Sequence, residues 1–134
     1  MYLIIDNSTD GKVTLHYTLN TKWVQRDFLF GLAGNALAAI DEILSAEKKT
    51  LSDLKGIGVV VGLGRFTSTR VAVTVANTLA YAMKIPVAGV TKIDYQDFDS
   101  IIQQTPVGQY VSAKYSGEAH IGKSKFKNQN AKFR

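Results

Sequence analysis

Short apolar runs and two long helix-like stretches divide the chain. Residues 3–5 are apolar, and residues 13–18 alternate between apolar and polar side chains, which predicts a strand with one solvated face. Turn-forming residues at 6–11 and 19–22 separate these runs from a third, short run at 23–26. The opening of the chain therefore predicts a three-stranded antiparallel meander.

Two longer stretches have the periodicity of helices. Residues 28–47 follow Asp27, a candidate N-cap, and residues 67–83 begin with Thr67 or Ser68 as the cap. At about 100° per residue, the apolar side chains of each stretch cover an arc of roughly 200°, about twice the usual core-facing stripe. Both helices are thus predicted to bury more than the face that packs on a sheet.

Apolar strands and a further helix complete the pattern. Residues 57–61 and 86–90 have the composition of strands covered on both faces, and residues 94–103 predict a weaker helix. Residues 110–115 alternate and predict a last strand. The order predicts an α/β fold, in which an antiparallel β-meander is followed by β-α-β-α-β in one mixed sheet with helices on its faces.

The two wide apolar arcs predict a contact surface. We expect the two long helices to lie side by side and to offer a joint apolar face to a partner, since exposed apolar patches usually mark association. The alternative is that the helices pack on each other and under the C-terminal segment. The expected interface residues are Leu29, Ala33, Leu37, Ile40, Leu44, Ala72, Val75, Ala76, Leu79, Ala80 and Met83.

Composition narrows the class of protein. The 134 residues fit one domain, and they include no cysteine and no apolar stretch long enough to cross a membrane. The net charge of +5 comes from a basic tail at residues 123–134, while the remaining charges balance. We expect this tail to be disordered, with a weak contact to RNA as the alternative, and we expect a cytoplasmic protein.

The glycine turn at residues 62–67 is a candidate anion site. Its sequence, G-L-G-R-F-T, departs from the dinucleotide fingerprint at Thr67 and lacks the lysine of a P-loop. Backbone amides at the start of the following helix could still hold an anion. The residues near such an anion or nucleotide would be Asp6, Ser8, Gly62, Gly64, Arg65, Thr67 and Arg70.

Other polar groups offer little chemistry. Residues 6–9 could bracket a phosphate and magnesium, or could form an ordinary hairpin turn. His16 and His120 are expected on a strand surface and in a loop, and neither has a neighbouring acid at the spacing of metal ligands. With no metal cluster and no catalytic residues in the pattern, the residues alone predict a non-catalytic binding domain.

Three features together resemble the TsaB (YeaZ) family. They are I-I-D-N-S-T at residues 4–9 before a hairpin, an apolar helix that starts near residue 28, and a stretch at residues 58–90 that begins G-V-V-V-G-L-G-R-F-T-S-T-R and ends K-I-P-V-A-G-V. The family pattern has D-T-S-T, then G-P-G-S-F-T-G-x-R, then x-I-P-V-x-G-V. The resemblance implies an actin/Hsp70-like (ASKHA, ribonuclease H-like) domain over residues 1–106, with residues 107–122 as the remnant or start of a second domain.

The resemblance also implies a function. Family members are inactive paralogues of the catalytic subunit TsaD, and with TsaD and the ATPase TsaE they support threonylcarbamoyladenosine formation at position 37 of certain tRNAs. Their two long helices form a bundle with TsaD, or with a second copy in its absence. We therefore expect a non-catalytic scaffold that binds a TsaD-type partner, with a TsaE-type ATPase as a further partner and tRNA contacted indirectly or through the tail.

Several residues depart from the family pattern. Leu63, Arg65 and Ser68 replace Pro, Ser and Gly, and Asn7 replaces the first Thr of D-T-S-T. The chain also ends where a second actin-like domain would begin, so ATP and magnesium are expected only at a partner interface. Two other hypotheses stay open: a small nucleotide-binding enzyme of the same superfamily, and a homodimeric interaction domain unrelated to TsaD.

Overall fold

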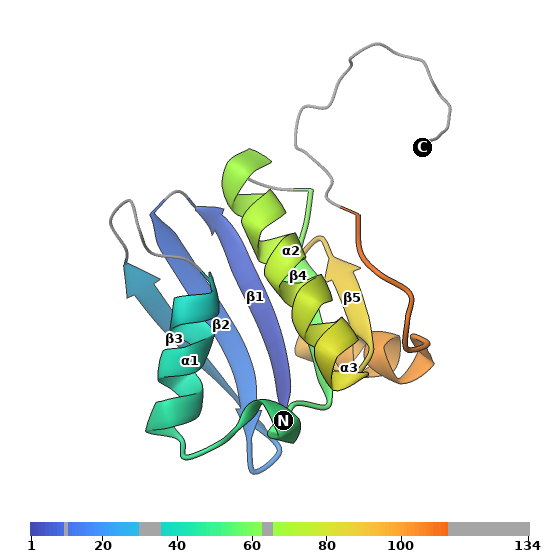
Figure 1. The fold of residues 1–134 in the computed structure, drawn as a ribbon, viewed down its shortest axis with the longest axis horizontal. Coiled ribbons are helices and arrows are strands. Elements are labelled where there is room, and N and C mark those ends of the chain that lie inside the picture. Colours follow the sequence, from blue (N-terminus) through green and yellow to red (C-terminus); the bar gives the residue numbers. More distant parts are fainter. Residues whose placement is uncertain (10, 30–35, 63–65, 113–134) are drawn as a thin grey trace.

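The computed structural model describes residues 1–9, 11–29, 36–62 and 66–112, which form one mixed sheet with helices on both faces (Figure 1). The strands are β1 (Tyr2–Thr9), β2 (Lys12–Leu19), β3 (Lys22–Leu29), β4 (Gly56–Val60) and β5 (Val87–Val90). The helices are α1 (Ala36–Ala46), α2 (Phe66–Met83) and α3 (Tyr95–Gln104), with a short 3-10 helix at Leu51–Asp53.

The sheet has the strand order β3-β2-β1-β4-β5. Strands β1, β2 and β3 pair antiparallel, whereas β1, β4 and β5 pair parallel through crossovers that contain the helices. The predicted meander followed by β-α-β-α-β is confirmed. Because β1 lies at the centre, it joins the antiparallel half of the sheet to the parallel half.

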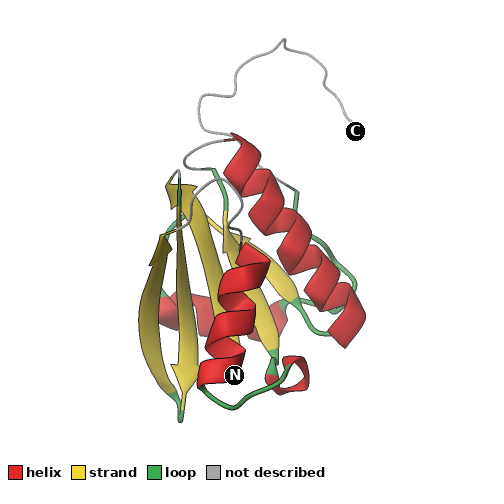
Figure 2. Ribbon diagram, turned by 60° about the vertical axis from the view of Figure 1, so that its left-hand side comes forward, coloured by secondary structure: helices red, strands yellow, loops and turns green. Residues whose placement is uncertain are grey.

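The helices cover the sheet from both sides (Figure 2). Helices α1 and α2 pack on one face, where Leu3 and Ile5 of β1 point, and α3 packs on the other, where Ile4 points. The predicted side-by-side placement of the two long helices is confirmed. The predicted solvated face of β2 is wrong, since Thr14 and His16 are buried on the side that carries α3.

Glycines in β4 set how closely α3 approaches the sheet. A Cβ atom on Gly58 would lie 2.4 Å from Phe98 Cε1, and one on Gly56 would lie 2.7 Å from Ile102 Cγ1. Both distances are too short for real carbon contacts, so these positions require glycine at this helix-to-sheet spacing. Glycines within β4 therefore allow α3 to pack closely on this face of the sheet.

The first long helix begins later than the sequence predicts. The expected helix at residues 28–47 and its cap at Asp27 are wrong, because β3 continues to Leu29 and α1 begins at Ala36. Each residue of β3 pairs with β2 along a complete hairpin register from Leu19–Lys22 to Lys12–Leu29. That ladder, with Phe28 buried in the core, outweighs the helical periodicity of the same residues.

The other two helices match their predictions closely. Helix α2 begins at Phe66, so Thr67 and Ser68 lie within its first turn and the cap position falls outside the described residues. Helix α3 begins after Asp94, whose carboxylate accepts hydrogen bonds from the backbone N–H groups of Gln96 and Asp97. Residues 110–112 have no strand structure, and the rest of that predicted strand, the basic tail and His120 lie outside the described residues.

Candidate functional site

Most of the predicted interface belongs to the core of this chain. Helix α1 buries its apolar stripe against the sheet, and α2 does the same along the alanines at positions 72, 76 and 80. The interface residues that are buried in this way are Ile40, Leu44, Ala72, Ala76, Leu79 and Ala80. Mutual packing of helices and sheet therefore accounts for the greater part of the two wide arcs.

A smaller apolar surface remains on the outside of the two helices. On α2, Val71 is 37 % exposed, Val75 is partly exposed and Ala82 is exposed. We call these three residues the outer row, since their spacing places them along one side of the helix. On α1, Leu37 is 51 % exposed. These residues are available for contact with another protein without unfolding of the core.

The remaining predicted interface residues have other positions. Met83 is partly buried at the end of α2, and Leu29 is 81 % exposed at the end of β3 and not on a helix. Ala33 lies outside the described residues. Sequence reasoning missed Val71 and Ala82, although their spacing from Val75 would have placed both on the same side of the helix.

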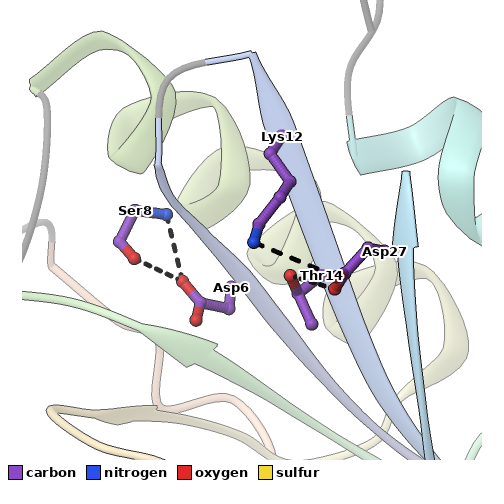
Figure 3. Close-up of polar contacts among 5 residues, drawn as sticks. All are labelled: Asp6, Ser8, Lys12, Thr14 and Asp27. Carbon is purple, nitrogen blue, oxygen red and sulfur yellow. Dashed lines mark hydrogen bonds and ion pairs between the residues drawn. The ribbon is translucent and has the colours of Figure 1, made fainter. Parts of the chain in front are cut away.

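The carboxyl end of β1 carries the first candidate anion residues (Figure 3). The Oδ1 atom of Asp6 accepts hydrogen bonds from the backbone N–H of Ser8 at 3.0 Å and from its hydroxyl at 2.6 Å. This local bonding of an aspartate to the residue two positions later is typical of a turn-forming motif. The predicted turn at residues 6–9 is wrong, because β1 continues to Thr9. The bonds between Asp6 and Ser8 lie where the register between β1 and β2 shifts, between Asp6 and Thr9.

The other candidate anion residues lie around the start of α2. Gly62 follows β4 with a φ angle of +83°, a backbone conformation that favours glycine, and a Cβ atom there would lie 3.7 Å from Thr91 Cγ2. Arg70 is exposed on α2, and Thr67 lies in its first turn. Gly64 and Arg65 lie outside the described residues, so anion binding at this turn stays a prediction.

Lys12 and Thr14 of β2 and Asp27 of β3 form a row of polar side chains across these two antiparallel strands (Figure 3). The Thr14 hydroxyl donates to Asp27 Oδ1 at 2.7 Å, and Lys12 Nζ lies 3.9 Å from Asp27 Oδ2. The hydrogen bond from Thr14, with a smaller contribution from Lys12, holds the pKa of Asp27 below its usual value. The hairpin register that pairs Leu19 with Lys22 also places Thr14 opposite Asp27, so a correct strand boundary would have predicted this contact.

His16 of β2 is buried between the sheet and α3. Its Nδ1 atom is 2.8 Å from the hydroxyl of Tyr95, the first residue of α3, and Tyr95 stacks on Trp23 with ring centroids 4.5 Å apart. Burial lowers the pKa of His16, against the opposing charges of Asp6 and Asp27, and burial raises the pKa of Tyr95. This arrangement attaches α3 to the sheet, and the expectation of a histidine on an open strand surface is wrong.

The described part of the chain lacks a metal-binding cluster: no group of three or more His, Cys, Asp or Glu side chains there could hold a metal ion. No helix there is long and apolar enough to span a bilayer.

Comparison with known proteins identifies the class. A structure of YeaZ from Pseudomonas aeruginosa superposes with a TM-score of 0.60 at 26 % sequence identity, covering 67 % of this chain and 44 % of that one. An uncharacterised protein with similarity to peptidase YEAZ from Pseudomonas aeruginosa shares the fold, with a TM-score of 0.61 at 23 % identity over 77 % of this chain and 48 % of that one. The fold is an ASKHA-like α/β fold, as expected.

The sequence assigns the family. The model for the family "TsaD: tRNA N6-adenosine threonylcarbamoyltransferase" matches residues 33–132. A tRNA N6-adenosine threonylcarbamoyltransferase of Geotalea uraniireducens (strain Rf4) is 31 % identical over 78 residues, which are 58 % of this chain and 23 % of that protein. The chain belongs to this family, and its motifs and structural likeness group it with the YeaZ (TsaB) members. It spans less than half of the length of each of these relatives.

Proposed function

We propose that this chain is a non-catalytic subunit in tRNA threonylcarbamoyladenosine modification, and that it binds a TsaD-type catalytic partner. Family membership supports the pathway, since the matched family carries the name of the transferase. The outer surface of α1 and α2 is the contact site in this proposal. A TsaE-type ATPase is a further partner, and ATP with magnesium binds only where partners meet.

The observation that carries the proposal is the exposed apolar surface on two adjacent helices. Leu37 on α1 and Val71 in the outer row remain accessible, although the core takes up most other apolar residues of these helices. The described end of β1 supports a binding role over a catalytic one, because the Asp6 carboxylate accepts two hydrogen bonds from Ser8 in its own hairpin. A surface of this kind suits docking of another helix pair by packing of small and branched side chains.

Co-purification with a TsaD-type protein tests the proposal. Leu37→Glu and Val71→Glu each place a charge in the proposed contact and should weaken binding about tenfold or more, since an unpaired buried charge is unfavourable. Ile101→Glu is the matched control, because Ile101 is 39 % exposed but lies on α3, across the sheet. Ala76→Glu is unsuitable, because Ala76 is fully buried and the variant would test folding.

Two outcomes would contradict the proposal. Equal losses of binding in Val71→Glu and Ile101→Glu would mean that the α1 and α2 surface has no special role. Tight binding of ATP and magnesium by the isolated chain, measured by calorimetry, would instead favour a nucleotide-binding enzyme.

A further inference from the structure

The segment after α3 lies along the open edge of the sheet. Residues 105–112, here called the strap, run from the end of α3 beside β5, the last strand of the sheet (Figure 1). Tyr110 and Val111 of the strap share a cavity wall with Val87 and Gly89 of β5. Natural sheets cover or blunt such edges because an unpaired edge can add a strand from another chain.

The side chain of Asn77 holds the strap at Val111. Asn77 of α2 donates from Nδ2 to the carbonyl oxygen of Val111 at 3.0 Å, and its Oδ1 accepts from the N–H of Val111 at 3.0 Å. The amide thus meets both peptide groups of one residue, as a neighbouring strand would in a ladder. This pair joins residues that are 34 positions apart in the chain.

The space beside Gly89, which has no side chain and which we call the notch in β5, is filled by Val111. A Cβ atom on Gly89 would lie 3.1 Å from Val111 Cγ1 and 3.3 Å from Val61 Cγ2. The absence of a side chain at Gly89 therefore provides the space that Val111 fills. Asn77 orients the backbone of Val111, and Gly89 admits its side chain.

The rest of the strap is loosely packed. A cavity of about 300 Å³ is lined by both β5 and the strap, and another of about 320 Å³ lies between Val107, Tyr110 and the end of α2. The ring centroids of Tyr110 and Tyr81 are 6.5 Å apart, and both side chains are exposed to solvent. A Cβ atom on Gly108 would meet nothing within 4 Å. Thr105 is bonded to the last turn of α3 through its hydroxyl and its N–H. Beyond this first residue, the described contacts of the strap are concentrated at Val111.

We propose that Asn77 is the latch of a releasable strap that covers the open β5 edge. While the pair with Val111 is made, residues 105–112 shield the edge, and when the pair breaks they leave it together. The inference does not depend on the proposed function, since it rests on contacts within the chain.

Hydrogen exchange of the full chain tests the latch. Asn77→Ala removes both hydrogen bonds and should speed exchange of residues 105–112 and 87–90 by about tenfold, while α1 and β1 exchange as in the wild type. Gly89→Ala fills the notch without touching Asn77 and should loosen the same segment. Thr78→Ala, at an exposed neighbour on α2, is the control and should change neither.

A second readout separates the latch from general stability. The chain has no cysteine, so Ser112→Cys gives a single site for a spin label. The label should become more mobile when Asn77→Ala is added. The latch is overturned if exchange and label mobility stay unchanged in Asn77→Ala, or if exchange also rises throughout α2 and β4, which would assign Asn77 to the support of the whole fold.

Discussion

Gly58 lies in the middle of β4, under the ring of Phe98. The ring would collide with any side chain there, so Gly58→Ala forces the helix away from the sheet. We expect a loss of about 1–3 kcal/mol in the free energy of unfolding, the usual range for overpacking. Urea denaturation measures the loss.

The Phe98→Leu background provides the control for this prediction. A smaller side chain on α3 leaves room for the new methyl group, so Gly58→Ala should be less destabilising there than in the wild type. Equal losses in both backgrounds would show that contact with the Phe98 ring is not the cause.

His16 makes stability depend on pH. Burial lowers its pKa in the folded chain below the ordinary value of 6.5, so the unfolded chain binds the proton more readily. The contribution of His16 is fully present above pH 6.5 and is lost as the pH falls from 6.5 through the lower folded pKa. His16→Gln should reduce this loss of stability between neutral and acidic pH.

Denaturation curves at several pH values test the role of His16. His120 and the carboxylates are common to both proteins, so the difference between wild type and His16→Gln reports on His16 alone. Curves that fall in parallel with decreasing pH would mean that the folded chain does not lower the pKa of His16.

At the scale of elements, the N-terminus of α3 depends on Asp94. Its carboxylate accepts from the N–H groups of Gln96 and Asp97, each at 3.1 Å. Asp94→Ala should destabilise the protein by about 1 kcal/mol, the usual effect of losing an N-cap. Ser100→Ala, at an exposed position within the same helix, is the control for chemical denaturation. A loss no larger than that of the control would contradict the capping role.

At the boundary between β3 and α1, residues that were predicted as the start of a helix form the end of a strand. Residues 28 and 29 fit the apolar periodicity of a helix and also that of a strand. The local pattern alone therefore cannot decide between helix and strand at these positions. In the folded chain the hairpin ladder pairs Phe28 with Val13 and Leu29 with Lys12. Helix α2 and helix α3 had no competing partner strand, and their predicted bounds agree with the structure to within one residue.

At the scale of the whole molecule, the outer surface of α1 and α2 is where we expect self-association. In the absence of a catalytic partner, we expect two copies to pair through Leu37 and the outer row. Val71→Glu should shift the chain toward the monomer in light scattering over a concentration range, and Ile101→Glu should behave as the wild type does. A wild-type chain that stays monomeric at high concentration would contradict this expectation.

The candidate site was predictable in part. The sequence identified the two helices. It predicted Leu37 and Val75 as interface residues, and it predicted Asp6 and Ser8 as residues near an anion. It could not separate Ile40 and Ala76, which the core buries, from Leu37 and Val75, which retain exposure. Periodicity gives the direction in which a side chain leaves the helix. It does not tell how much of the helix surface the sheet and the neighbouring helix cover.

The sequence by itself determined the alternation of strands and helices, the buried character of β4 and the family motifs, because these depend on local period and residue type. The tertiary structure decided where β3 ends, which face of β2 is covered, and where His16, Asp27 and Asn77 find their partners. Each of those features depends on a contact between residues distant in the chain, such as Asn77 with Val111 or His16 with Tyr95. Such contacts form only when the sheet brings the segments together, so no local pattern records them.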